Sequence, residues 1–278
     1  MLWCVMRLLT CRTKRLRRQS NGIMDRVVTV HSYKKDFSSE CVRDGLLSIV
    51  GSATTPRSIE RLAKAFNKCI ELSHCETFLC VRVRDALLTM CAAATTAECV
   101  WQAADALVPF VFGAVNYPRY PRPMVSRMVA TCEMRDAVVM LASRATTSKC
   151  AGIVASTFEW TEDWWQVPPE MFWTLFVHDA LVELAYRATE PVDVAACACA
   201  VTMFTRKAQG EVKRELLTHA MRDAVVALVP YATTWSSASS IKNALIALKS
   251  TYRAGSLSRV IDELDETIRL IVSSLFKV

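Results

Sequence analysis

Residues 84–96 read RDALLTMCAAATT, and this stretch returns along the chain in recognisable form. In each copy a triplet Ala-Thr-Thr, or a close variant, begins nine residues after the Asp. The five aspartates are Asp44, Asp85, Asp136, Asp179 and Asp223, and the triplets begin at Ala53, Ala94, Ala145, Ala188 and Ala232. The aspartates are spaced by 41, 51, 43 and 44 residues, which is typical of stacked helix pairs.

The first half of each copy predicts a helix. Residues two before and two and five after the Asp are apolar or small in every copy, and this i, i+4, i+7 spacing forms one stripe along a helix. The outer stripe positions are Val42, Val83, Met134, Val177 and Met221, and Ile49, Met90, Leu141, Leu184 and Leu228. Apolar residues also precede this stretch at Leu79, Met128, Trp173 and Leu217. We therefore expect a long first helix with the Asp near its middle.

The second half predicts another helix that begins at the Thr pair, because a Thr hydroxyl accepts hydrogen bonds from first-turn amides. Residues 95–98 also have the spacing of a capping box. Counted from the second residue of the pair, apolar or small residues recur at +4, +7, +8 and +11, with Lys242 as the one exception. They are Ile59, Leu62, Ala63 and Phe66; Val100, Ala103, Ala104 and Leu107; Ala151, Val154, Ala155 and Phe158; Val194, Cys197, Ala198 and Val201; and Ala238, Ile241 and Leu245.

The composition agrees with an all-α fold, because 52% of the 278 residues are hydrophobic and only 7 are Gly. In period and helix-pair layout, residues 41–250 resemble armadillo/HEAT-type repeat proteins, although the usual consensus residues are missing. This resemblance implies one elongated α-solenoid, a superhelix of stacked helix pairs, over residues 41–250. Residues 251–278 form an amphipathic helix that either caps the solenoid or acts as a zipper; its apolar positions are Ile261, Leu264, Ile268, Ile271, Leu275 and Val278.

The charge is concentrated in the N-terminal tail, residues 1–40. Six basic residues and no acid occur in residues 1–23, so the repeat body is nearly neutral. A neutral body argues against binding driven by nucleic-acid phosphates. The tail is interpreted as a mitochondrial presequence, a membrane-surface anchor, a disordered segment or an extension ahead of Met24. Arg7 and Arg12 interrupt its apolar stretch, so no spanning helix is expected, and the predicted location is intracellular and cytoplasmic, or mitochondrial.

The chain carries no signature of an enzyme or of a metal site. No P-loop, H-E-x-x-H, G-x-S-x-G or C-x-x-C motif occurs, so we expect neither catalysis nor a metal or cofactor. His178 replaces the Arg of the repeat and is interpreted as a repeat variant. Cysteines predicted to lie in helices as reduced, buried residues are Cys69, Cys80, Cys91, Cys99, Cys132, Cys150, Cys197 and Cys199.

Two sets of residues are candidates for function. The repeated aspartates predict a structural ladder in which each carboxylate accepts hydrogen bonds from the Arg or from a neighbouring repeat; a row of ligand-binding groups is the alternative. The connections between repeats vary more and predict a rim that binds a protein or peptide partner through Tyr117, Arg119, Tyr120, Arg122, Trp164 and Trp165. The Trp residues could instead fill gaps between repeats, and Tyr117 and Tyr120 could stack on nucleic acid.

The resemblance to helical-repeat proteins implies a non-enzymatic protein–protein interaction scaffold, which we expect to be a monomer. An organellar nucleic-acid-associated helical-repeat protein is the alternative function. The alternative depends on the basic tail, whereas the scaffold depends on the repeat body.

Overall fold

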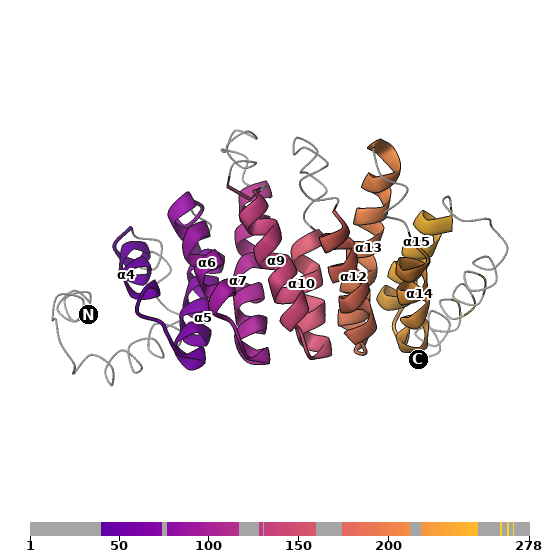
Figure 1. Ribbon diagram of the computed structural model, residues 1–278, viewed down its shortest axis with the longest axis horizontal. Helices are drawn as coiled ribbons and strands as arrows, with labels where there is room; N and C mark the ends of the chain where they lie inside the picture. The colour runs from indigo at the N-terminus through magenta and orange to yellow at the C-terminus, as the bar shows by residue number, and fades with distance from the viewer. Residues whose placement is uncertain are drawn as a thin grey trace, which may run out of the picture. The chain divides into compact units, whose positions relative to one another are not determined.

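The computed structural model describes residues 40–73, 77–116, 128–129, 131–159, 174–211, 218–249, 262, 266 and 269. These residues contain ten α-helices and one short 3-10 helix, with no β-strand among them, and this confirms the all-α prediction (Figure 1). The chain divides into two compact units, residues 1–117 and 118–278. Most of the tail (1–40) and of the C-terminal segment (251–278) lies outside the described residues, and the single solenoid domain over 41–250 stays a prediction.

The first unit contains two helix pairs. Its helices are α4 (Glu40–Val50), α5 (Pro56–Ser73), α6 (Val81–Ala93) and α7 (Ala97–Asn116). The first helix of one pair packs against the first helix of the next, α4 on α6, and the second helices pack likewise, α5 on α7. Within this unit the pairs therefore form two layers.

The second unit repeats the arrangement with three pairs. Its described helices are α9 (Cys132–Arg144), α10 (Ser148–Glu159), α12 (Leu175–Arg187), α13 (Pro191–Glu211), α14 (His219–Ala227), η3 (Val229–Tyr231) and α15 (Trp235–Lys249). First helices α9, α12 and α14 pack in that order, and second helices α10, α13 and α15 do the same (Figure 1). Short turns join the first helix to the second helix in each pair.

The predicted apolar stripes form the core. Every second-helix position named above, from Ile59 to Leu245, is buried, and Lys242 is only half-buried. The first-helix stripe is also buried, except in α4, where Val42 and Ile49 are half-buried. Apolar burial of this kind is the main favourable term in folding, so the stripes correctly identify the surfaces that hold the pairs together.

The second helices begin as predicted. The hydroxyl of the second Thr accepts an amide hydrogen bond three residues on, as between Thr55 Oγ1 and Ser58 N at 3.2 Å. The same cap is formed by Thr96, Thr147 and Thr234. The prediction of a capping box at residues 95–98 is wrong. Thr96, and not Thr95, is the cap, and Glu98 accepts a hydrogen bond from Gln102 at 3.0 Å.

The prediction of a long first helix is wrong. Each first helix begins four residues before its Asp, so the Asp is the fifth helical residue. Three of the first helices are capped at their start by a Thr that the prediction had placed inside the helix. Thr131, Thr174 and Thr218 accept from Met134 N, Val177 N and Met221 N, at 3.2 to 3.4 Å. Leu79 is buried but precedes its helix; Trp173 and Leu217 lie outside the described residues.

No disulfide bond joins the described cysteines. Cys69, Cys91, Cys99, Cys150 and Cys197 are buried as predicted, and burial raises the pKa of the Cys69 thiol to about 12. Three positions differ from expectation: Cys80 precedes α6 instead of lying in it, Cys132 is exposed in the first turn of α9, and Cys199 is only half-buried. Among the described helices, none is long and apolar enough to cross a membrane.

Candidate interaction surface

The repeated aspartates are exposed and bonded to the preceding residue. Arg43, Arg84, Arg135 and Arg222 each donate to the next Asp at 2.6 to 3.0 Å, and His178 Nδ1 lies 2.7 Å from Asp179 Oδ1. The Asp side chains are 48% to 71% exposed, whereas the preceding side chains are only 5% to 26% exposed. Each pair therefore presents its carboxylate to solvent and keeps its basic partner beneath.

The basic residue also reaches the next repeat. Arg43 donates to the carbonyl of Thr77, just before α6, at 3.3 Å. His178 Nε2 lies 2.8 Å from the hydroxyl of Thr218, the cap of α14. In these two copies the residue before the Asp links its own carboxylate to the start of the next first helix. The predicted register-setting role of the aspartates themselves stays a prediction.

Each carboxylate uses only one of its two oxygens. In all five copies every hydrogen bond and ion pair is made by Oδ1, so Oδ2 has no hydrogen-bond partner within the described part of the chain. At Asp44 a second cation, Arg82 on α6, joins Oδ1 at 3.1 Å. The hydrogen bond from Arg43, reinforced by both positive charges, lowers the pKa of Asp44 below its usual value.

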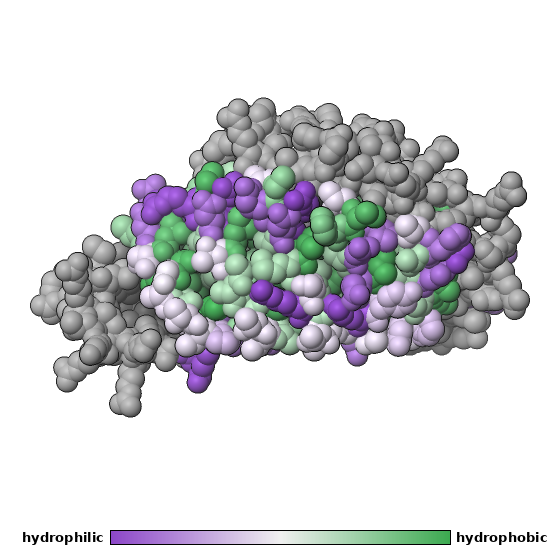
Figure 2. Space-filling view, in the orientation of Figure 1, coloured by the Kyte–Doolittle hydropathy of each residue, from purple (hydrophilic) through white to green (hydrophobic). Residues whose placement is uncertain are grey.

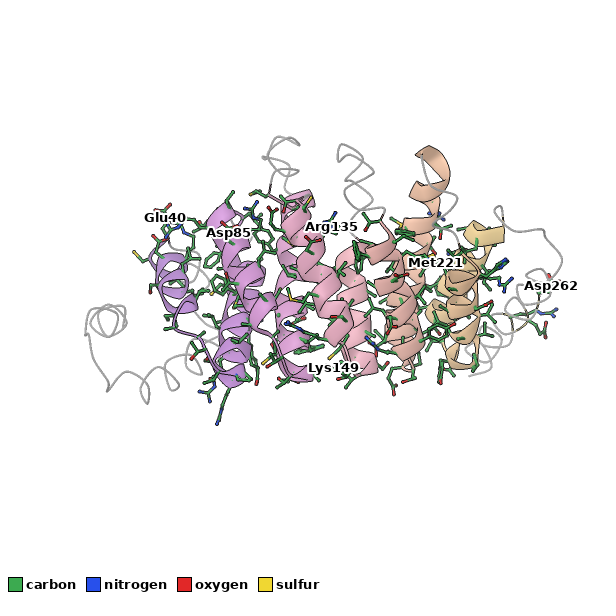
Figure 3. All side chains as sticks on the ribbon, viewed as in Figure 1. Glu40, Asp85, Arg135, Lys149, Met221 and Asp262 are labelled. Atoms are coloured by element: carbon green, nitrogen blue, oxygen red, sulfur yellow. The ribbon has the colours of Figure 1, made fainter. Side chains whose placement is uncertain are left out.

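Among the described residues of the second unit, no second cation of this kind joins a repeated Asp. Arg82 stands three residues before its own Asp, and the equivalent residues of α12 and α14 are Phe176 and Ala220. Neither side chain can neutralise the carboxylate of the preceding repeat. Asp136 and Asp179 are accordingly more exposed than Asp44. Figure 3 shows Arg135, in the first turn of α9, and Lys149, in the first turn of α10, at opposite ends of this helix pair.

One helix of the second unit exposes aromatic rings beside its carboxylates. On α12, Phe176 is 72% exposed and Tyr186 is 55% exposed. Asp179 and Glu183 lie between them in sequence, and the Glu183 side chain is 59% exposed. Arg187 donates to Glu183 Oε2 at 2.5 Å and to the carbonyl of Ala142 in α9 at 2.8 Å, so this cation is also used inside the unit. We call Phe176, Asp179, Glu183 and Tyr186 the α12 face.

A polar contact joins the start of α10 to the start of α13. The Ser148 hydroxyl, at the start of α10, accepts from the amides of Thr189 and Glu190 at 2.9 and 3.0 Å and donates to Asp193 at 2.7 Å. Gly152 lies directly under Asp193: a methyl group added there would be 2.7 Å from the Asp193 Cβ. The absence of a side chain at residue 152 therefore permits α13 to lie close to α10.

The rim predicted from the variable connections remains a prediction. Tyr117, Arg119, Tyr120, Arg122, Trp164 and Trp165 all lie outside the described residues. Sequence reasoning missed Phe176 and Tyr186, although a signal was present. Both stand at repeat positions, three before and seven after the Asp, that carry other residue types in the remaining copies.

The described residues do not group three or more His, Cys, Asp or Glu side chains in a way that could hold a metal ion. No protein-family model matches the chain, and neither a curated protein nor a solved structure shows significant similarity to it.

Proposed function

We propose that the protein is a non-enzymatic protein–protein interaction scaffold whose helix pairs form an α-solenoid of the armadillo/HEAT kind. The packing inside each unit supports this proposal, because first helices contact first helices and second helices contact second helices. Stacking of this type gives a long surface assembled from equivalent positions of successive repeats. Such a surface binds partners without any catalytic group.

The observation that carries the proposal is the invariant carboxylate at the fifth residue of every first helix. It is exposed in all five copies, and one of its oxygens has no hydrogen-bond partner within the described residues. A group needed only for stacking would be expected to lie between the repeats. An exposed carboxylate that repeats with the scaffold is suited to contacting another molecule.

Affinity capture with the full chain, followed by mass spectrometry and reciprocal capture, tests the function. A defined set of protein partners is expected, and replacement of Tyr117, Arg119, Tyr120 and Arg122 by Ala tests whether the predicted rim takes part. Small-angle scattering should show an elongated particle. Recovery of nucleic acid, with affinity falling steeply as salt is added, would favour the alternative of a nucleic-acid-associated protein.

Absence of any reproducible partner, or turnover of a substrate that depends on particular acids or histidines, would contradict the scaffold function. The capture is done with the wild-type chain and with the rim variant side by side, and circular dichroism of both confirms that helix content is unchanged. This control separates loss of a contact from loss of the fold.

A further inference from the structure

We propose that the α12 face, together with Asp136 and Asp223 on the flanking helices, binds a basic segment of a partner protein whose cations lie between apolar side chains. This inference rests on the scaffold function proposed above and specifies the surface and the chemistry of the partner.

The four residues of the α12 face lie on one side of the helix. Their spacings of three, seven and ten residues place them within an arc of about 80°, over a length of about 15 Å. Helix α12 packs against α9 on one side and α14 on the other, so the α12 face is the central strip of the first-helix layer in this unit. The carboxylates of Asp136 and Asp223 belong to those neighbouring helices.

The aromatic residues are the anchors of this strip. Phe176 and its neighbour Leu175, which is 60% exposed, place apolar surface at the N-terminal end of α12, where Figure 2 shows hydrophobic residues gathered beside hydrophilic ones. Tyr186 marks the other end. In the first unit Val81 is the one described large apolar side chain that is comparably exposed. Exposed aromatic rings close to charged groups are typical of the residues that dominate binding energy at interfaces.

The charges between the anchors select a cationic partner. Arg135, His178, Arg187 and Arg222 lie under or beside the carboxylates and are committed to contacts within the unit. The carboxylates of Asp136, Asp179, Glu183 and Asp223 are instead 53% to 71% exposed. A Lys or Arg of a partner finds acceptors here, whereas phosphate groups of nucleic acid or of an anionic membrane meet like charge.

The spacing of these groups predicts the pattern of the partner. Asp179 and Glu183 are four residues apart, as are two basic residues on one side of a partner helix lying along α12. Apolar side chains before and after that basic pair would reach Phe176 and Tyr186. The partner segment is therefore a basic amphipathic helix with two cations between apolar anchors.

Selection from a displayed library of helical peptides against the full chain tests the inference. We expect enriched peptides to carry Lys or Arg pairs flanked by Leu, Phe or Trp, and to weaken several-fold when the ionic strength is raised. Their synthetic forms, measured by fluorescence anisotropy, should lose at least about tenfold in affinity with the Phe176→Ala/Tyr186→Ala variant. Glu183→Lys should also lower the affinity for these peptides.

The equivalent positions of α6 supply a matched control. Asp85 is exposed and bonded to the preceding Arg, as Asp179 is to His178, but no aromatic residue flanks it at the equivalent positions. Asp85→Asn should leave peptide affinity unchanged, while Asp179→Asn weakens it. Because all substituted side chains are exposed, thermal melting should show that each variant remains folded.

The outcomes separate this inference from the function on which it rests. Enrichment of acidic or uncharged peptides, or equal binding by wild type and the Phe176→Ala/Tyr186→Ala variant, would overturn the inference. If cellular partners are nevertheless captured by that variant, the scaffold function stands without this surface. If the α12 substitutions instead abolish self-association of the chain, the occupant is a second copy and the proposed partner is wrong.

Discussion

The two units join their helix pairs by different kinds of contact. In the first unit the exposed Arg82 reaches Asp44, and the buried Asn67 donates to Asp105 across α5 and α7. The second unit uses His178 with Thr218, Arg187 with the carbonyl of Ala142, and Ser148 with the start of α13. The same repeat therefore tolerates different polar connections, provided that its apolar stripes are kept.

This difference determines what each unit presents to solvent. In the first unit one repeated carboxylate, Asp44, is held by two cations, and its second cation comes from the next repeat. In the second unit Phe176 and Ala220 occupy the positions equivalent to Arg82, so Asp136 and Asp179 keep one basic partner each. A carboxylate that is not needed between repeats is available to another molecule.

Gly152→Ala should have the largest effect on stability, because the new methyl group would collide with Asp193 and disturb its bond to Ser148. We expect a loss of about 1–3 kcal/mol in the free energy of unfolding, measured with urea. Gly51→Ala is the control, since a methyl group there would meet nothing within 4 Å. Equal effects of the two substitutions would show that close approach of α10 and α13 does not stabilise the second unit.

His178→Ala should have the next largest effect. The His178 ring is almost fully buried, and its removal leaves the Thr218 hydroxyl and Asp179 without this partner. A loss of about 1–2 kcal/mol is expected, with faster amide hydrogen exchange in α12 and α14. The exposed His219 provides a control on α14. Unchanged exchange in α14 would contradict the idea that His178 links the two helices.

Arg82→Ala should cost no more than about 1 kcal/mol, because the pair with Asp44 is exposed and screened by water. The loss should shrink when ionic strength rises from about 0.02 M to about 0.5 M. Asp179→Asn, which removes a carboxylate without a second cation, should show a weaker dependence on salt. The opposite order would mean that the charged contact does not distinguish the units.

The contribution of Asp44 to the pH dependence of stability is the smallest expected effect. It tests the contact between Arg82 and Asp44 directly. Its pKa is lowered in the folded chain by the hydrogen bond from Arg43 and by the nearby charges of Arg43 and Arg82. The stabilisation is therefore present above the pKa of the unfolded chain and is lost as the pH falls through the lower folded value. Carboxylate titration by NMR should show the Asp44 pKa rising towards its usual value in Arg82→Ala; an unchanged pKa would exclude a role for Arg82.

The sequence predicted the helix pairs and their core well, whereas the predicted rim lies outside the described residues and the α12 face was not predicted. Thr55, Thr96, Thr147 and Thr234 cap the second helices as expected, because a cap acts within a few residues. The earlier caps were missed because the apolar residue before each one continues the helical period. Phe176 and Tyr186 were missed because the repeat was recognised from residues that all copies share, whereas these two positions differ between copies.

The sequence by itself determined the period, the all-α class, the apolar stripes and the starts of the second helices, since all of these depend on residues near one another in the chain. The tertiary structure decided which member of each Arg-Asp pair is exposed and which group of the next repeat the other member reaches. Those outcomes depend on contacts between residues about forty positions apart, such as His178 with Thr218, Ser148 with Asp193 and Arg82 with Asp44. A helical period records the buried side of one helix, but it carries no information on what the neighbouring helix places opposite.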